Sequence, residues 1–322
     1  MDKFVSEICG FLRSYNLSLN KVGNGCGYES IQVDLPSGEG SRTMVLLGTL
    51  ADAIELAKTQ QEVAQAAISS IFSESKSYPL VITEDRWRNQ KSMMQARILS
   101  HLEIFTQIYA RNCEIKRIDK ATAREFLEAN HSYGDAACKY RYGLYLKRHT
   151  GHCHAERSEA SLSPGTLVAV ATFSNARKWI KGDKTVRSYE WTRYASLPGV
   201  RLSGGMGRLL KAFIKDVQPD DIMTYADLEW SEGKVYEQLG FTLEGTRPSV
   251  TFTIDTSEWS RTPMSSEAQL PLTPVCPSAR HPLAGGGMST PAVASEDMPT
   301  PASKIFQNFG SNKYRLKLTD YQ

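Results

Sequence analysis

The chain has 322 residues, of which 41% are hydrophobic and 23% charged; 38 Lys and Arg against 35 Asp and Glu give a formal net charge of +3. This composition is typical of globular proteins and excludes wholesale disorder, collagen-like repeats and a chain-long coiled coil. No run of about 18 apolar residues is present, and the N-terminal segment lacks the apolar stretch of a signal peptide, so we expect a cytoplasmic protein without membrane contact. The length predicts two domains, and six cysteines without CxxC spacing predict free thiols.

The N-terminal third is expected to form a small α/β domain over residues 1–110. Phe4, Ile8 and Leu12 recur at helical spacing, whereas short apolar runs bounded by turn residues indicate strands. In chain order we expect a helix over 1–19, a turn at 23–25, strands over 28–35 and 43–48, a helix over 50–72, a strand over 78–83 and a helix over 88–110.

A second unit is expected to begin at residue 111. Its expected elements are a strand at 113–118, a helix at 120–130, strands at 141–147, 166–174 and 186–196, a helix at 205–217, a strand at 222–226, a helix at 232–239 and a strand at 250–254. This order, β–α–β–β–β–α–β–α–β, again predicts a mixed α and β architecture, and the unit is expected to cover residues 111–261.

Two stretches interrupt the second unit and are interpreted as insertions. Residues 149–165 separate two strands that a tight turn could join, and residues 262–303 hold 8 of the 14 prolines and a GGG run. A segment of the latter composition buries too little apolar surface to order itself, which predicts a disordered linker. Residues 304–322 regain strand-like alternation and can pair with 250–254, because the entropy of loop closure grows slowly with length.

The first insertion contains a close group of metal-ligand types, His149, His152, Cys153 and His154. Ligands that are adjacent in sequence rarely build a closed tetrahedral site. The sequence therefore predicts no metal centre.

A glycine loop is the most informative segment of the chain. It follows a predicted strand, begins a predicted amphipathic helix, and comprises Leu202, Ser203, Gly204, Gly205, Met206, Gly207 and Arg208. Glycines let the backbone approach a ligand closely, and the first turn of a helix offers free N–H groups at the positive end of its dipole. The loop thus favours an anion site suited to a pyrophosphate, and a carboxylate at Gly205 is expected to block it. A tight strand-to-helix turn without a ligand is the alternative, and the absence of a following Lys-Ser or Lys-Thr excludes a P-loop.

The segment IMTYADLEWSEGKVYEQLGF at 222–241 follows the glycine loop with a strand, a loop and a short helix. This succession resembles the GNAT family of acyltransferases. The resemblance implies a mixed, mostly antiparallel sheet flanked by helices (an α+β fold), acetyl-CoA as cosubstrate with its pyrophosphate held by residues 202–208, and a strand splay for the pantetheine arm. It also implies that Tyr236 protonates the departing CoA thiolate.

A closer resemblance covers about residues 110–320. The strings IYARNCEIKRI, FLEANHSYG, YEWTRYAS, GGMGRLLKAFI and FQNFGSNKYRLKL are similar, in order, to a GNAT-like domain of phage and mobile-element proteins. In those proteins a nuclease-type domain often precedes it, and LVITEDRWRNQKSMMQARI resembles the end of a very-short-patch-repair-like, restriction-endonuclease-type domain. The strand TMVLLG lacks the metal-binding acid of that type and leaves only Asp34, Glu84 and Asp85, so we expect a degenerate nuclease-like domain.

Acyl transfer to an amine needs a base for the amine and an acid for the thiolate. Glu190 precedes the glycine loop and is a candidate base, or else an ion-pair partner of Arg193 or Arg187. Tyr236 is the candidate acid, or else a tyrosine that caps the core. His131 is a second candidate base, or else a helix-end dipole contact. Arg193 and Asp227 are candidate substrate-binding residues, although Asp227 could instead cap a helix.

The expected function is acyl-CoA-dependent acetyl transfer to an amine acceptor. The alternative is a non-catalytic DNA- or RNA-binding protein of a phage or mobile element. Lys and Arg outnumber Asp and Glu between Lys139 and Lys215, with Trp179, Trp191 and Tyr194 interspersed, which favours phosphate contacts. A basic face also suits CoA, which carries phosphates, so both functions stay open on this observation.

Overall fold

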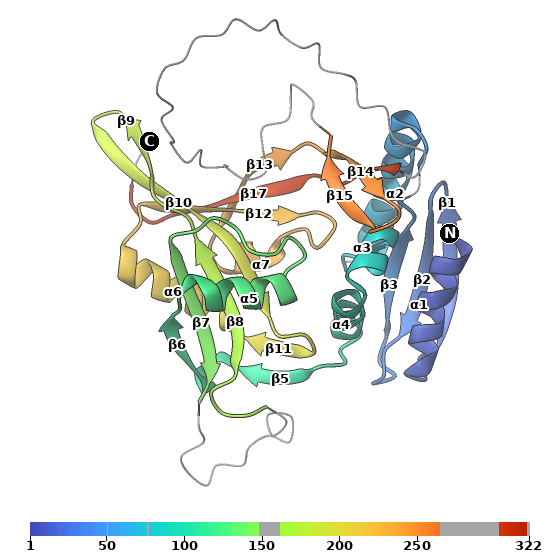
Figure 1. Cartoon of the computed structure of the whole chain (residues 1–322), viewed down its shortest axis with the longest axis horizontal. Coiled ribbons are helices and arrows are strands. Elements are labelled where there is room, and N and C mark those ends of the chain that lie inside the picture. Colours follow the sequence, from blue (N-terminus) through green and yellow to red (C-terminus); the bar gives the residue numbers. More distant parts are fainter. Residues whose placement is uncertain (50, 76, 148–161, 265–302, 321–322) are drawn as a thin grey trace, which may run out of the picture.

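The computed structural model describes residues 1–49, 51–75, 77–147, 162–264 and 303–320. It has two halves that lie side by side (Figure 1). Most of the expected insertions, at 149–165 and 262–303, and the group from His149 to His154 lie outside the described residues. The exceptions are residues 162–165, which form a turn, and the first and last residues of the second stretch, which are strand rather than linker.

The first half is a four-stranded sheet with helices packed against it. Its elements are α1 (Asp2–Ser14), β1 (Leu19–Gly25), β2 (Tyr28–Asp34), β3 (Ser41–Leu47), α2 (Ile54–Ser75), β4 (Leu80–Thr83), α3 (Glu84–Asn89) and α4 (Lys91–His101). The strand order is β1-β2-β3-β4, antiparallel except for β3 and β4, which run parallel on either side of the α2 crossover. Phe4, Ile8 and Leu12 of α1 are fully buried against this sheet, as their spacing predicts.

The second half is built on a larger, mostly antiparallel sheet with the order β13-β17-β12-β10-β8-β7-β6, and β9 pairs with β10. Its elements are β5 (Thr106–Tyr109), η1 (Ala110–Asn112), β6 (Cys113–Arg117), α5 (Lys120–Asn130), β7 (Tyr140–Leu146), β8 (Leu167–Phe173), β9 (Arg177–Lys181), β10 (Lys184–Ser196), β11 (Val200–Ser203), α6 (Gly205–Val217), β12 (Asp221–Asp227), α7 (Lys234–Gln238) and β13 (Thr242–Arg247). Phe213 of α6 is fully buried and stacks on Phe173 of β8, which fixes α6 to the sheet. The α+β class with a mostly antiparallel sheet is confirmed.

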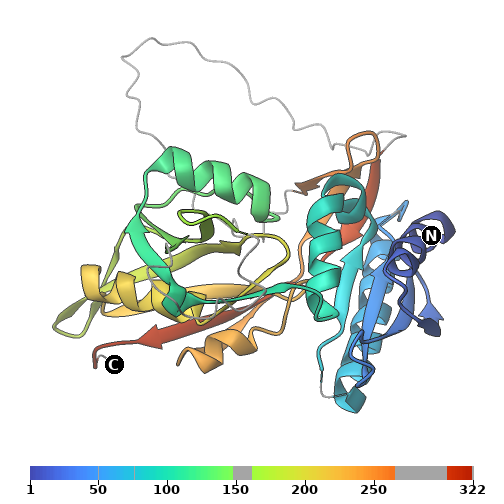
Figure 2. The same ribbon diagram turned by 90° about the horizontal axis from the view of Figure 1, so that it is seen from below.

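The C-terminal strands join both halves. They are β14 (Thr251–Asp255), β15 (Ser260–Pro263), β16 (Ser303–Gln307) and β17 (Ser311–Lys317). β16 pairs with β14, so the expected pairing of the C-terminal stretch with 250–254 is present. β17 then enters the large sheet between β12 and β13, and Figure 2 shows the red segment crossing from one half to the other.

The small sheet β15-β14-β16 packs on the first half. Phe252, Ile254 and Phe306 share an apolar cluster with Ala64 of α2 and Val45 of β3. Segments on both sides of the expected boundary at residue 110 therefore form a common core, and the halves are joined by packing as well as by chain.

Three local expectations are wrong. Residues 19–25 form a strand instead of the end of a helix and a turn, because Asn16 takes a positive φ of 56° and ends α1. The helix expected over 88–110 is divided at Gln90, and residues 106–109 are a strand, β5, that pairs in parallel with β11. β5 is stabilised by pairing with the distant strand β11, which local periodicity does not register, whereas β1 pairs with β2 in a tight hairpin.

No helix among the described residues is long and apolar enough to cross a membrane. The cytoplasmic location stays a prediction.

Candidate functional site

The two central strands of the large sheet part next to the glycine loop. β10 and β12 pair in parallel only where residues 188–190 face 221–223. Beyond that point β10 continues along β8 with a bulge between Trp191 and Arg193, and β12 continues along β17. Thr224 Oγ1 donates to the Trp191 carbonyl at 3.1 Å where the strands part. A bulge bends its strand, and here it accompanies the opening of a gap between two facing strand edges.

A cavity of about 850 Å³ opens at this gap. It brings together six of the residues that the sequence proposed for the site: His131, Glu190, Arg193, Met206, Asp227 and Tyr236. These residues come from the end of α5, from β10, from the start of α6, from the end of β12 and from α7. Their roles stay predictions, but they do lie around a single cavity.

Glu190 is partly buried in the cavity wall. Burial raises the pKa of its carboxyl, and the charges of Arg177, Arg193 and Arg247 act in the opposite direction. No ion pair of Glu190 with Arg193 or Arg187 is present among the described residues, and Arg187 instead pairs with Asp220. A carboxylate with a raised pKa is a stronger base, so it is better suited to take a proton from an amine near neutral pH.

Tyr236 is the middle residue of the short helix α7. Its ring contacts Trp191, Phe241 and Tyr314 at centroid distances of 5.6–6.0 Å, so the ring also fills the space between α7 and the sheet. Burial raises the pKa of the hydroxyl, and a hydrogen bond with the Thr224 side chain acts against this rise. The hydroxyl is therefore protonated at neutral pH and retains a proton to donate.

The other three polar candidates have defined partners. The Tyr133 amide donates to His131 Nδ1 at 3.1 Å, and burial lowers the pKa of His131 to about 3, so its imidazole is neutral. Arg193 Nε donates to the Gly134 carbonyl at 3.2 Å. Asp227 accepts from Tyr133 Oη at 2.7 Å and from the Glu229 amide at 2.9 Å, so it forms a local turn and does not cap α7.

The glycine loop begins α6 as expected, with Gly204 at the N-cap in the left-handed region, φ 77°. Met206 is its cavity-lining member. A Cβ on Gly205 would lie 2.6 Å from Leu202 Cδ2, so Gly205 faces the core and a substitution there would disturb packing rather than probe a ligand. Arg208 donates to the carbonyls of Ala110 and Cys113, which joins α6 to the β5–β6 connection. The contact of residues 202–208 with a cofactor stays a prediction.

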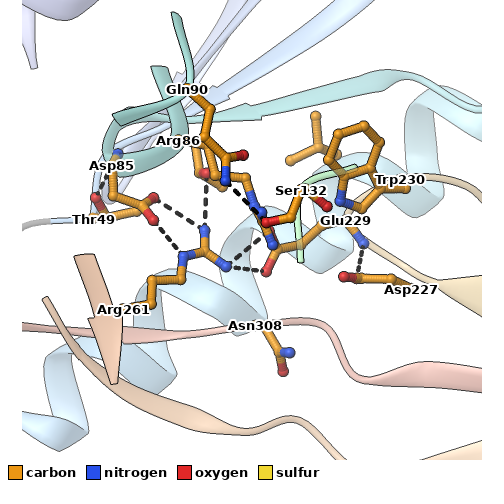
Figure 3. Close-up of polar contacts among 12 residues, drawn as sticks. Thr49, Asp85, Arg86, Gln90, Ser132, Asp227, Glu229, Trp230, Arg261 and Asn308 are labelled. Carbon is orange, nitrogen blue, oxygen red and sulfur yellow. Dashed lines mark hydrogen bonds and ion pairs between the residues drawn. The ribbon is translucent and has the colours of Figure 1, made fainter. Parts of the chain in front are cut away.

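The first half supplies the opposite wall of the cavity, which sequence reasoning did not foresee. This wall consists of Asp85, Arg86 and Gln90 from the first half and their neighbours Tyr133, Trp230 and Arg261 from the second half. Arg261 of β15 lies between two carboxylates (Figure 3). It contacts Asp85 through two hydrogen bonds and Glu229 through two more, at 2.8 and 3.0 Å.

Burial opposes ionisation of Asp85 and Glu229, but Arg261 outweighs it and the pKa of each carboxyl is lowered. The only sequence signal for this wall is the acidic and basic string EDRWR at 84–88. Its partners lie more than a hundred residues away in the chain, at Glu229 and Arg261.

No group of three or more His, Cys, Asp or Glu side chains that could hold a metal ion occurs among the described residues. Two of the three acids expected to remain from a nuclease site are held by arginines: Glu84 by Arg88 at 3.3 Å and Asp85 by Arg261. The nuclease-like origin of the first half stays a prediction.

No protein-family model matches the chain, and no curated protein matches it. Among solved structures it is similar to a chain of the NatC complex bound to Gag peptide and CoA (12% identity, 65% of this chain and 99% of that chain, TM-score 0.33). It is also similar to Eis1 from Mycobacterium abscessus (16% identity, 45% of this chain and 34% of that chain, TM-score 0.30). A third similar structure is that of a conserved protein of unknown function from Enterococcus faecalis V583, a probable N-acyltransferase (13% identity, 46% of this chain and 36% of that chain, TM-score 0.30). The chain spans about a third of the length of the latter two. Scores this low carry no functional argument, so the proposals below rest on the geometry of this chain.

Proposed function

We propose that this protein is a GNAT-type N-acyltransferase that moves an acetyl group from acetyl-CoA to an amine. The observation that carries the proposal is the cavity at the parting of β10 and β12, which has the start of α6 at Met206, a carboxyl with a raised pKa at Glu190 and the hydroxyl of Tyr236 around it.

The residues present suit the parts of acetyl-CoA. The first N–H groups of α6 have no acceptor within the helix and lie at the positive end of its dipole, which suits a pyrophosphate. The facing edges of β10 and β12 beyond Glu190 and Met223 offer backbone groups to the amide-bearing pantetheine arm.

The chemistry then needs a base for the amine and an acid for the thiolate. Glu190 takes a proton from the ammonium form of the acceptor, and the free amine attacks the thioester carbonyl carbon. As the tetrahedral intermediate collapses, the carbon–sulfur bond breaks and the Tyr236 hydroxyl protonates the thiolate, which leaves as CoA. A second proton of the amine passes to solvent, Glu190 releases the proton it took to solvent, and Tyr236 regains its proton from solvent.

Calorimetric titration with acetyl-CoA tests the proposal, with Met206→Glu as the perturbation. A glutamate in the first turn favours the helix but places a negative charge where the pyrophosphate would bind. We expect wild type and the matched control Met206→Leu to bind, and Met206→Glu to bind at least about tenfold more weakly. No heat with wild type, or equal affinity of Met206→Glu, would contradict the proposal.

A second candidate function is nucleic-acid binding, favoured by the β9–β10 hairpin. The hairpin projects from the large sheet (Figure 1), and its tip exposes Trp179 by 53% and Ile180 by 84% next to Lys178. An exposed aromatic ring beside cations suits stacking bases and phosphates. A gel-shift salt series with single-stranded DNA should show a steep salt slope that Lys178→Ser reduces, whereas Trp179→Ser should weaken binding without changing the slope; no shift at low salt would remove this function. The origin in a phage or mobile element stays a prediction.

A further inference from the structure

The cavity has a corner whose hydrogen-bonding capacity is not used. Arg86 of α3 lines the cavity and is only 6% exposed. Its Nε donates to Glu229 Oε2 at 3.1 Å, but its Nη2 has no hydrogen-bond partner among the described residues. A buried guanidinium donor without an acceptor is costly, so such a group in a cavity wall indicates a ligand that completes it.

A second unused donor lies on the neighbouring side chain. Trp230 Nε1 is buried and without a partner in the described part of the chain, and Trp230 also lines the cavity. The Arg86 guanidinium carbon lies 5.7 Å from the Trp230 ring centroid and 4.9 Å from that of Tyr133. The two rings hold the guanidinium plane, and Figure 3 shows Arg86 and Trp230 in the same corner.

The charges of the corner are unevenly matched. Arg86, Arg97 and Arg261 bring three guanidinium groups, whereas Asp85 and Glu229 are the two carboxyls whose pKa is lowered. Asp227 is a third carboxyl, but burial and then the Glu229 charge raise its pKa. Arg261 occupies Asp85 and Glu229 with four hydrogen bonds of its own, so the charge of Arg86 is only partly matched, which suits an anion.

We propose that this corner binds an oxyanion of the acceptor, a carboxylate or a phosphate, through Arg86 Nη2 and Trp230 Nε1. The acceptor class is then a primary amine that also bears an anionic group, with its amine at the Glu190 side of the cavity and its oxyanion at the Arg86 side. The inference rests on the proposed function for the identity of the reaction, but the corner itself is defined by Arg86, Trp230 and Tyr133.

Two matched pairs of amines test the inference by calorimetry with wild-type protein, both alone and with saturating CoA. O-phosphoethanolamine against ethanolamine isolates the phosphate, and β-alanine against propylamine isolates the carboxylate. In at least one pair the anionic amine is expected to bind about tenfold more tightly, because each charge-assisted hydrogen bond adds affinity, and the pair that shows it identifies the oxyanion. Equal binding within both pairs overturns the inference.

Arg86→Met should abolish that preference, Arg86→Lys should retain part of it, and Arg88→Met is the matched control. Arg88 lies on the same helix but pairs with Glu7 and Glu84 and does not line the cavity. Glu229 keeps two hydrogen bonds from Arg261 when Arg86 is removed, which supports the fold of the variant. A preference that persists in Arg86→Met overturns the inference.

Acetyl-CoA binding separates the two proposals. The affinity for acetyl-CoA should be the same in Arg86→Met and Arg88→Met; a selective loss in Arg86→Met would assign the corner to the cosubstrate and overturn the acceptor site. Failure of wild type to bind acetyl-CoA, together with a preference for the anionic amine, would refute the transferase and leave the anion corner in place.

Discussion

Replacing Arg261 by methionine should destabilise the protein more than any exposed charge change. Arg261 donates five hydrogen bonds, to Thr83, Asp85 and Glu229, and its side chain is only 10% exposed. Removing one partner of a buried ion pair costs about 3–5 kcal/mol, because the remaining charge is left buried. Arg86 still donates to Glu229, so Asp85 carries most of the loss and we expect a cost within that range.

The assay is equilibrium unfolding in urea at neutral pH, followed by tryptophan fluorescence. The control Lys58→Met breaks an exposed pair with Glu55 within α2, which should cost no more than about 1 kcal/mol. Adding Asp85→Asn and Glu229→Gln to Arg261→Met removes the unpaired charges and should restore part of the stability.

The pH dependence gives a second check on this cluster. In wild type the lowered pKa values of Asp85 and Glu229 stabilise the fold fully above their ordinary values of 3.8 and 4.5, and this contribution is lost as the pH falls through the lowered values. Without Arg261, burial raises both pKa values, so the cost of Arg261→Met should shrink on acidification. A cost no larger than that of Lys58→Met at neutral pH would refute the reasoning.

Two predictions concern catalysis. Glu190→Gln should lower kcat by about a hundredfold or more. In wild type the rate should rise with pH through a midpoint above the ordinary pKa of 4.5, because Glu190 acts in its ionised form and its pKa is raised. A pH–rate profile unchanged by the substitution would exclude Glu190 as the base. Tyr236→Phe keeps the ring contacts with Trp191 and Tyr314 but loses the hydroxyl. The value of kcat should therefore fall about a hundredfold, whereas the affinity for acetyl-CoA should stay the same. Full activity of this variant in single-turnover assays would exclude Tyr236 as the acid.

The elements with local signals could be predicted from the sequence. α5 lies at 120–130 as expected, because Asp119 caps its first turn by accepting from the Thr122 amide at 2.8 Å. α6 begins at Gly205 after the N-cap Gly204, and its apolar positions face the sheet. Glu190 followed from its position on the strand before the glycine loop, and Tyr236 from the resemblance of residues 222–241 to the GNAT family.

The rest depends on contacts between distant segments. The sequence predicts residues 106–109 as the end of a helix, but they form strand β5 because they pair with β11. In the sequence, Asp85 and Arg86 belong to a string of acidic and basic residues that is expected to be exposed. They are buried because Arg261 pairs with Asp85 and Glu229 pairs with Arg86. The opposite wall of the cavity was missed for that reason, since charged residues are ordinarily exposed unless paired.

A crystal structure of the protein with acetyl-CoA would test the central claim most directly. The account predicts the pyrophosphate at the first turn of α6 beside Met206, and the thioester carbonyl between β10 and β12, within reach of Glu190 and Tyr236. Acetyl-CoA bound elsewhere, or a cavity that excludes it at saturating concentration, would contradict the account.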